Sequence, residues 1–311
     1  MMENKKVQER YIVALLWCAP VIFLFALIFI ELPQPDSLRS ISENAQSLFI
    51  GRHNPIESAA VEAKAVFVKD LNTGEILYEK NAHIPLPLAS LTKVMTAIVT
   101  REYGNDVQGV FISRAAMRPD EEEQLNVGET FSLSKLIDYM MVASSNDGAA
   151  AIALAVQRND NTTSFTDKMN TVAQSIGMTE SHFLNETGLD ENESQAGAYG
   201  SARDVATMLE YALQNHSDVI DATKEASITA YSTSGYPHTI KNTNSIVGTL
   251  PNVIASKTGF TELAGGNLAV VIDPGLNRPV AIVVLGSSFV GRFTDVSNLA
   301  QGVSKYFSEL E

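Results

Sequence analysis

Ser90 and Lys93 stand three residues apart in the segment PLASLTKVMTA, where a helix is predicted to begin. On a helix such positions share one face, with about 5–6 Å between their Cβ atoms. A serine hydroxyl is a weak nucleophile that needs an adjacent base, and a lysine becomes one when burial or a second cation makes it neutral. Taken alone, however, the pair is better explained as a helix cap and a surface charge.

Short patterns of this kind also arise by chance. Ser132 and Lys135 repeat the S-x-x-K spacing, and there Ser132 is predicted to cap the following helix. The S-x-N spacing likewise occurs at Ser42 to Asn44, in a segment without clear periodicity. Neither spacing is therefore sufficient evidence for a catalytic site.

The order of three motifs is stronger evidence than any one of them. Ser90 and Lys93 are followed by Ser144-Ser145-Asn146 between two predicted helices, and then by Lys257-Thr258-Gly259 at the end of a predicted strand. This ordered trio is typical of class A β-lactamases and penicillin-binding proteins, which form an acyl-enzyme on the first serine.

The residues around these motifs resemble one family in particular, the D-alanyl-D-alanine carboxypeptidases. These are low-molecular-weight penicillin-binding proteins of the serine-peptidase type. The similarity covers roughly residues 60–308. The segments that carry it are PLASLTKVMTAIV, VGETFSLSKLIDYMMVASSNDGAAAIA, GMTESHFLNETGLDENESQAGAYGSARDVATML, NTNSIV and SKTGFTELAGGNLAVV.

The resemblance implies catalytic roles for four residues. Ser90 would be the acylated nucleophile, and Lys93 would take its proton. Ser144 would relay a proton to the leaving amine, while Asn146 would hold Lys93 and a substrate amide oxygen. Each role suits the chemistry of its side chain.

It also implies how the substrate is bound. Lys257 would supply a positive field for Ser144 and for the substrate carboxylate, which Thr258 would hydrogen-bond. Gly259 would leave room for an extended substrate along the strand edge. The backbone N–H groups of Ser90 and Phe260 would form the oxyanion hole.

The implied activity is removal of the terminal D-Ala from peptidoglycan stem peptides through a Ser90 acyl-enzyme, without a cofactor. β-Lactam antibiotics would then be covalent inhibitors. A D,D-endopeptidase that cuts peptidoglycan crosslinks would use the same residues. A serine β-lactamase is a further alternative, with Glu180 and Asn185 as its deacylation pair, although their spacing is one residue longer than expected. A catalytically silent wall-binding module is the alternative outside enzymes.

The patterns that must position these residues predict an α+β fold of the β-lactamase/transpeptidase-like type. Strand patterns begin and end the folded part, and helical patterns lie between them. We expect an antiparallel sheet with a helical layer. The predicted strands are AKAVFVKD, EILYEKN and residues 253–258, 266–273 and 279–286; the predicted helices start near Ser90 and cover residues 133–143, 148–157, 163–176, 202–214 and 293–307.

The N-terminal segment predicts a membrane anchor. Residues 11–30 contain no charge and are long enough as a helix to cross a hydrocarbon core of roughly 30 Å. Lys5, Lys6 and Arg10 precede this run, so the chain after it is expected on the extracytoplasmic side of the cell membrane. A cleaved signal peptide would have a shorter apolar run, followed closely by small residues.

The predicted domains are therefore a cytoplasmic tail (1–10), a single transmembrane helix (11–30), a linker (31–58) and a catalytic domain (59–311). Many family members carry a further C-terminal β-rich domain. We expect none here, because the chain ends soon after the last helix of the predicted catalytic domain.

Composition excludes several other classes of protein. The formal net charge of −14 argues against binding to nucleic acid, which favours a basic surface. The single cysteine, Cys18, excludes an internal disulfide and a zinc site made of cysteines. The five histidines are scattered without metal-ligand spacing, so we expect no metal site.

Overall fold

The computed structural model describes residues 54–117, 125–275 and 277–309. The predicted tail, the apolar span at residues 11–30 and most of the predicted linker lie outside these ranges. Within them, no helix is both long and apolar enough to cross a membrane.

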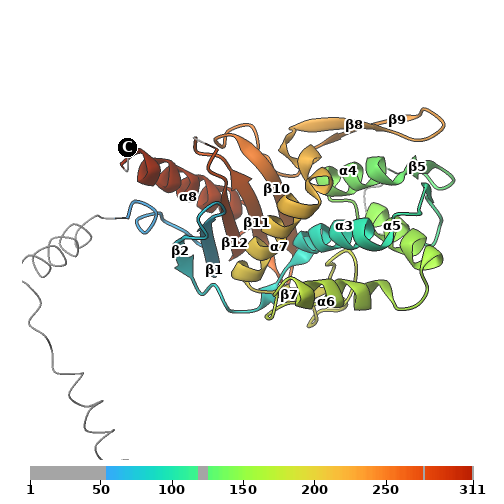
Figure 1. Cartoon of the computed structure of the whole chain (residues 1–311), viewed down its shortest axis with the longest axis horizontal. Coiled ribbons are helices and arrows are strands. Elements are labelled where there is room, and N and C mark those ends of the chain that lie inside the picture. Colours follow the sequence, from blue (N-terminus) through green and yellow to red (C-terminus); the bar gives the residue numbers. More distant parts are fainter. Residues whose placement is uncertain (1–53, 118–124, 276, 310–311) are drawn as a thin grey trace, which may run out of the picture. The chain divides into compact units, whose positions relative to one another are not determined.

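A five-stranded antiparallel sheet forms the centre of the folded part (Figure 1). Its strand order is β10-β11-β12-β1-β2, so β10 is a terminal strand and the two ends of the folded chain meet inside the sheet. The strands are β1 (Ala65–Asp70), β2 (Ile76–Lys80), β10 (Val253–Thr261), β11 (Gly265–Ile272) and β12 (Val280–Ser287).

Both faces of this sheet are covered, which explains why its central strands are apolar almost throughout. In β12, Val283 faces the core shared with the internal helices, whereas Ile282 and Val284 face the core under the C-terminal helix α8 (Gly291–Ser308). Figure 1 shows α8 on one side of the sheet and α7 (Ala202–Asn215) with α3 (Thr92–Tyr103) on the other. The prediction of an antiparallel sheet with a helical layer is confirmed, and α8 adds a second layer.

The internal helices agree with the predicted ones to within a few residues. The segment LSKLIDYMMVA forms α4 over the predicted residues. Ser132 occupies the N-cap position of α4 as predicted, but its side chain makes no capping hydrogen bond. The remaining elements of the helical layer are α4 (Leu133–Ala143), α5 (Asn146–Asn159), α6 (Phe165–Ser175) and the short 3₁₀ helices η1 (Ala89–Leu91), η2 (Ser217–Val219) and η3 (Asp221–Lys224).

Three small sheets accompany the helical layer. One has the order β3-β7-β6, and the others are the pairs β4-β5 and β8-β9. Their strands are β3 (Leu86–Pro87), β4 (Gly109–Phe111), β5 (Thr130–Ser132), β6 (His182–Phe183), β7 (Ala198–Gly200), β8 (Ser227–Tyr231) and β9 (Pro237–Lys241).

The folded part begins earlier than the predicted boundary at residue 59. Ile56 is fully buried in the core under α8. Its backbone lies so close to Gly302 of α8 that a Cβ on that glycine would stand 2.9 Å from the Cα of Ile56. The carboxylate of Asp295 accepts hydrogen bonds from the backbone N–H groups of Glu62 and Ala63. Residues 54–58 therefore pack on the domain rather than belonging to a linker.

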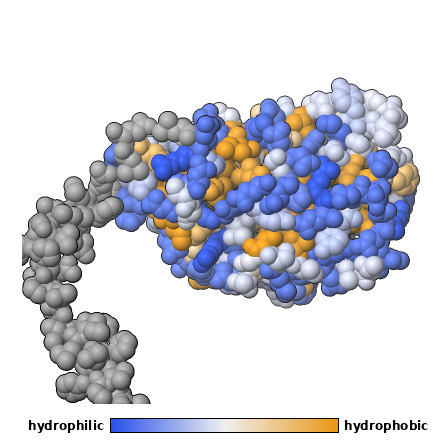
Figure 2. Space-filling view, viewed as in Figure 1, coloured by the Kyte–Doolittle hydropathy of each residue, from blue (hydrophilic) through white to orange (hydrophobic). Residues whose placement is uncertain are grey.

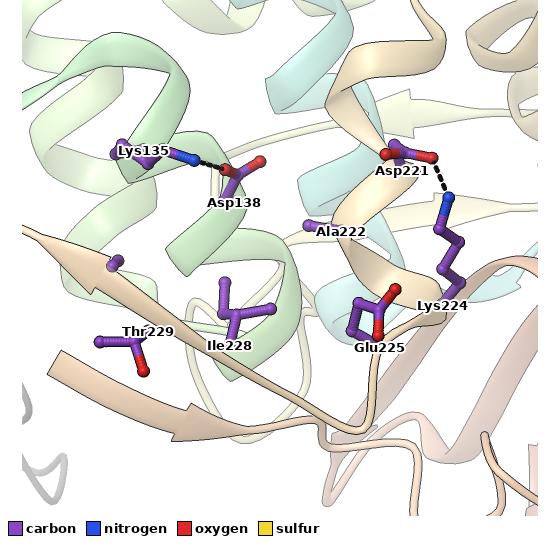
Figure 3. A pocket seen from close by; sticks show the side chains of 9 residues that line it. Lys135, Asp138, Asp221, Ala222, Lys224, Glu225, Ile228 and Thr229 are labelled. Atoms are coloured by element: carbon purple, nitrogen blue, oxygen red, sulfur yellow. Dashed lines mark hydrogen bonds and ion pairs between the residues drawn. The ribbon is translucent and has the colours of Figure 1, made fainter.

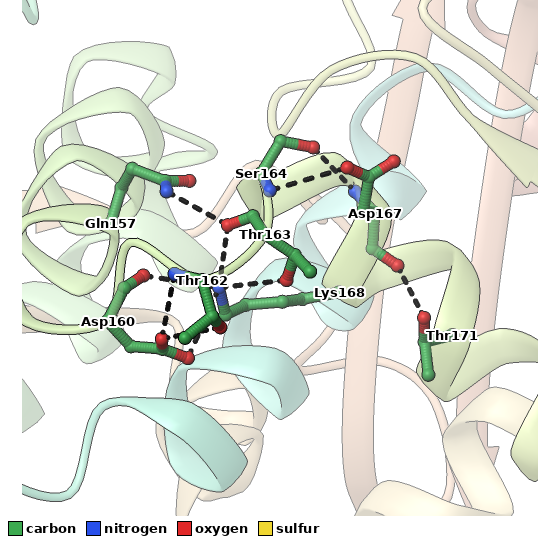
Figure 4. Close-up of polar contacts among 8 residues, drawn as sticks. All are labelled: Gln157, Asp160, Thr162, Thr163, Ser164, Asp167, Lys168 and Thr171. Atoms are coloured by element: carbon green, nitrogen blue, oxygen red, sulfur yellow. Dashed lines mark hydrogen bonds and ion pairs between the residues drawn. The ribbon is translucent and has the colours of Figure 1, made fainter.

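A buried lysine organises the connection between α5 and α6 (Figure 4). Nζ of Lys168 donates to the backbone oxygen of Thr163 at 2.8 Å and to that of Asp160 at 3.2 Å. It also forms an ion pair with the Asp160 carboxylate at 3.3 Å. Because these acceptors belong to one short connection, we interpret Lys168 as a structural residue.

The molecular surface seen from the same direction is mostly hydrophilic (Figure 2). Apolar side chains on this face form separate patches with polar residues between them. This arrangement is typical of a protein surface that contacts water.

Candidate active site

Ser90 lies in the short turn η1, which leads directly into α3. The preceding residue, Ala89, has a φ of +48°, in the left-handed region that non-glycine residues rarely adopt. Such backbone costs roughly 1–3 kcal/mol and is concentrated at functional sites. Ser90 is half-buried and makes no capping hydrogen bond for α3. The simpler interpretation of Ser90 as a helix cap is therefore wrong.

Lys93 contacts the Ser90 hydroxyl as its spacing predicts. Its Nζ lies 2.9 Å from Oγ of Ser90. The same Nζ donates to Oδ1 of Asn146 and, at 2.9 Å, to the backbone oxygen of Thr187. Lys93 is fully buried, so its amine is held between the serine and fixed polar groups.

Ser144 lies at the junction between α4 and α5. It is the C-cap of α4 with a φ of +60°, a second left-handed non-glycine residue in the site. The neighbouring Ser145 caps α5, because its side chain accepts from the N–H of Gly148. Oγ of Ser144 lies 2.7 Å from Nζ of Lys257 on β10. The structure thus brings the S-x-N and K-T-G motifs together.

The environment of Lys257 is unfavourable for a positive charge. Burial lowers the pKa of this amine well below its usual value, and the positive charges of Lys93 and Arg292 lower it further. The sequence predicts that a second cation near Lys93 disfavours a positive charge in the site. The structure shows this effect at Lys257, whose pKa the charge of Lys93 helps to lower.

Thr258 and Gly259 position β10 against the rest of the site. Oγ1 of Thr258 donates to Oγ1 of Thr243 at 2.7 Å. A Cβ on Gly259 would stand 2.9 Å from the backbone oxygen of Leu88 and 3.2 Å from the backbone nitrogen of Ser90. The sequence predicts that Gly259 leaves space for the substrate. In the structure, the absence of a side chain at Gly259 also allows β10 to contact the turn that carries Ser90.

The outer edge of β10 is covered over only part of its length. Oγ1 of Thr223 in η3 accepts from the N–H of Ser256 at 3.0 Å. Beyond Ser256, no strand of the described residues pairs with this edge. The free edge therefore begins at the K-T-G motif, where an extended peptide could add as a further strand.

Phe260 follows the motif and has a side chain open to solvent. Its ring packs edge-to-face on that of Phe289, with 5.0 Å between centroids. Arg292 lies beneath this pair, and its guanidinium is 4.5 Å from the centre of the Phe289 ring. The side chains of Phe260 and Phe289 are 40% and 55% exposed, so they form an open aromatic rim beside the strand.

The second S-x-x-K match has no such surroundings. Nζ of Lys135 forms an ion pair with Asp138 at 3.0 Å and lies at a small polar pocket that also contains Asp221 and Lys224 (Figure 3). Asp221 and Lys224 are paired with each other. None of the predicted site residues lines this pocket, which supports the structural interpretation of Ser132 and Lys135.

Glu180, considered as the base of a β-lactamase, is engaged elsewhere. Its carboxylate lies 2.7 Å from Nδ1 of His83 and accepts from Oγ of Ser201 at 2.7 Å. The backbone oxygen of Thr187, seven residues further along the chain, accepts a hydrogen bond from Lys93. This arrangement does not favour a glutamate-activated water.

Three contributors to the site were not identified from sequence: Thr187, Thr243 and Arg292. Thr187 acts through a backbone carbonyl, which every residue has. Thr243 lies in the segment NTNSIV, which carried the family resemblance, although no role was assigned to it. Arg292 is the second residue of α8 and had no motif to mark it.

Comparison with known proteins agrees with this geometry. A family model described as D-alanyl-D-alanine carboxypeptidase matches residues 52–288. A D-alanyl-D-alanine endopeptidase of Pseudomonas aeruginosa is 29% identical, over 77% of this chain and 75% of the relative. The D-alanyl-D-alanine carboxypeptidase DacF of Bacillus subtilis is also 29% identical, but the match spans only 61% of its length.

Among solved structures, penicillin-binding protein D2 of Listeria monocytogenes with bound ampicillin has the same fold. Its TM-score is 0.67 at 26% identity, over 78% of this chain and 97% of that protein.

Proposed function

Because the chain belongs to the D-alanyl-D-alanine carboxypeptidase family of serine peptidases, we propose that it removes the terminal D-Ala from peptidoglycan stem peptides. The observation that supports this most directly is the pair of contacts from Lys93 to Ser90 and from Lys257 to Ser144 around one free strand edge. Together they provide a nucleophile, a base and a relay beside a site for an extended peptide.

In the acylation step, Oγ of Ser90 attacks the carbonyl carbon of the penultimate D-Ala, and Lys93 takes the hydroxyl proton. The N–H groups of Ser90 and Phe260 stabilise the resulting oxyanion. The peptide C–N bond then breaks, and Ser144 passes a proton to the departing amine of the terminal D-Ala. Attack by water on the Ser90 ester releases the shortened peptide.

This mechanism requires a neutral Lys93, and the substrate itself can provide that condition. Burial lowers the pKa of Lys257, and the charge of Lys93 lowers it further, so a proton on each of the two amines is unfavourable. A substrate carboxylate beside Thr258 and Lys257 would draw a proton to Lys257. Lys93 would then be neutral when the scissile carbonyl reaches Ser90.

β-Lactams would acylate Ser90 by the same route, with the ring C–N bond breaking in place of the peptide bond. The ampicillin- and cefotaxime-bound structures of the Listeria relative support this part of the proposal. The ring nitrogen stays attached to the acyl group, so water enters less easily and release is expected to be slow.

Crosslink cleavage is the alternative, because the Pseudomonas relative is named an endopeptidase. Both reactions break a bond on the carboxyl side of a D-Ala and would use the same residues. A digest of purified crosslinked and uncrosslinked muropeptides separates them, since only an endopeptidase converts dimers to monomers.

We also propose that residues 11–30 anchor the chain in the cell membrane, with the catalytic domain outside the cytoplasm. The proposal is supported by the uncharged run and the basic residues before it. Cell fractionation of the full chain tests it. Recovery in the membrane fraction at full mass is expected, whereas a shortened protein free of membrane would indicate a cleaved signal peptide.

The central test is mass spectrometry of the purified full chain after incubation with benzylpenicillin, beside the Ser90→Ala variant. One long-lived adduct that is absent from the variant is expected, together with D-Ala release from a stem-peptide substrate. Rapid loss of the drug without an adduct would favour a β-lactamase. No adduct and no turnover would favour a silent wall-binding module.

A further inference from the structure

Arg292 reaches the catalytic strand from the opposite side of the sheet. It lies in the first turn of α8 and is 5% exposed. Its Nη1 donates a hydrogen bond of 2.8 Å to the backbone oxygen of Gly259, within the K-T-G motif. A guanidinium has five donors, and burying this charge is costly unless they are used. Its Nε has no hydrogen-bond partner in the described residues.

The surroundings are shaped to hold this side chain in place. The guanidinium lies over the rings of Phe289 and Phe293, at 4.5 Å and 4.7 Å from their centres. A Cβ on Gly266 of β11 would stand 2.1 Å from the backbone oxygen of Ser288 and 3.3 Å from Cδ of Arg292, so the glycine allows close contact with Ser288 and also adjoins the arginine. Burial lowers the pKa of Arg292 to about 10, which leaves it protonated at neutral pH.

The backbone oxygen of Gly259, which accepts from Arg292, and the N–H of Phe260 belong to the same peptide group. The structure has no cis peptide in the described residues, so the Gly259 carbonyl and the Phe260 N–H point in opposite directions. The N–H of Ser256 points to the outer edge of β10, toward Thr223. In a strand, the N–H groups of alternate residues point to the same edge. The β10–β11 register has no irregularity beyond Ala255. The N–H of Phe260, four residues after Ser256, therefore also points to the free edge.

We infer that Arg292 is a positioning residue for the oxyanion hole. It fixes the plane of the Gly259–Phe260 peptide, and its positive charge polarises that peptide so that the Phe260 N–H donates more strongly. The inference rests on the proposed function, because that function places the Phe260 N–H at the oxyanion. Its consequence is a stronger hydrogen bond to the substrate carbonyl oxygen as negative charge develops there.

Two other roles would place an arginine here, and they predict different observations. Arg292 could hold β10 to α8 as a purely structural contact, or it could act only through the charge that lowers the pKa of Lys257. A contact that only stabilises the fold, or a charge that acts only on Lys257, leaves the Phe260 N–H in place in the folded protein and does not change its hydrogen bond to the acyl carbonyl. The stretching frequency of that carbonyl therefore distinguishes them, because a stronger hydrogen bond lowers the frequency.

The experiment uses the purified full chain, benzylpenicillin with a ¹³C-labelled β-lactam carbonyl, and infrared difference spectra of the acyl-enzyme. The rate of acylation is measured in parallel. For Arg292→Met we expect acylation about tenfold to a hundredfold slower, which is less than the loss of a whole oxyanion donor. We also expect the ester carbonyl band to move to higher wavenumber.

Arg292→Gln keeps a neutral donor of similar reach, so its ester carbonyl band should move in the same direction by a smaller amount. If Arg292→Met fails to fold, this second variant tests the inference. Arg278→Met is the matched control. Arg278 also lies over an aromatic ring, that of Phe307, but it pairs with Asp70 away from the site. Its band and its acylation rate should equal those of the wild type.

An unshifted carbonyl band in both Arg292 variants would overturn the inference, even if acylation slowed. A changed pH profile with an unshifted band would assign Arg292 to Lys257 alone. Absence of any acyl-enzyme in the wild type is a separate outcome, because it would refute the proposed function itself.

Discussion

Nζ of Lys257 lies 2.7 Å from Oγ of Ser144, although 113 residues separate them in the chain. The serine belongs to the junction of two helices, and the lysine belongs to the terminal strand of the main sheet. Their contact therefore joins the helical layer to the sheet at the place where Ser90 and Lys93 also meet. The four side chains form the walls of one site, and changes to each should have distinguishable effects.

Replacing Lys93 by Met should nearly abolish acylation, whereas replacing Lys135 by Met should not change it. Both lysines follow a serine at the S-x-x-K spacing, but only Lys93 contacts that serine. Loss of a general base typically slows a reaction by roughly 10²–10⁴-fold. Time-resolved mass spectrometry with benzylpenicillin measures both variants. Equal rates for the two would contradict the assignment of Lys93.

Gly259→Ala should impair both folding and acylation. The new Cβ would press on the Leu88 carbonyl and on the backbone nitrogen of Ser90. We expect a stability loss of about 1–3 kcal/mol, as for other overpacked sites. Misplacement of the nucleophile should slow acylation by roughly 10²-fold.

Gly248→Ala is the control for that variant, because no atom lies within 4 Å of the added Cβ and its backbone is compatible with alanine. Denaturant unfolding should place it within about 0.5 kcal/mol of the wild type. If Gly259→Ala behaved in the same way, the close approach of β10 to the serine turn would not be a constraint.

Lys257→Met should be more stable than the wild type at neutral pH, although inactive. The folded-state pKa of Lys257 is depressed, so the unfolded chain binds more protons between that value and the ordinary lysine pKa. The free energy of unfolding of the wild type therefore rises with pH across this window. The difference in free energy of unfolding between Lys257→Met and the wild type should shrink from pH 7 toward pH 10.

Urea unfolding at several pH values measures this difference. Lys224→Met is a suitable control, because an ion pair with Asp221 raises the pKa of that exposed lysine and gives a small effect of opposite sign. If the difference in free energy of unfolding between Lys257→Met and the wild type stayed constant with pH, the pKa of Lys257 would not be depressed in the folded state.

Lys168→Met should reduce stability without changing the chemistry. This lysine is buried like those of the site, but its Nζ hydrogen-bonds to the Asp160–Thr163 connection and lies 5.6 Å from the centre of the Tyr103 ring. Leaving these acceptors unpaired should cost about 1–3 kcal/mol. Thermal unfolding should show the loss, while the acylation rate of the folded protein remains that of the wild type. Slower acylation of folded protein would indicate that the connection between α5 and α6 affects the site.

Much of the architecture was predictable because it depends on local patterns. The apolar period of LSKLIDYMMVA gives α4 its observed bounds, and the apolar runs near the C-terminus give β10 to β12 within a few residues. The site could be proposed because three short motifs occur in a known order. The start of the folded part was placed too late, since Ile56 is buried by α8 and nothing in its own neighbourhood indicates that contact.

The remaining features depend on tertiary structure. The carbonyl of Thr187 meets Lys93 from 94 residues away, and a backbone oxygen has no residue type that could identify it. The side chains available for acyl transfer, and the order of their motifs, can be read from the amino-acid sequence alone. The depressed pKa of Lys257 and the hydrogen bond from Arg292 to Gly259 follow from the folded structure, because burial and distance set electrostatic effects and neither is a property of local sequence.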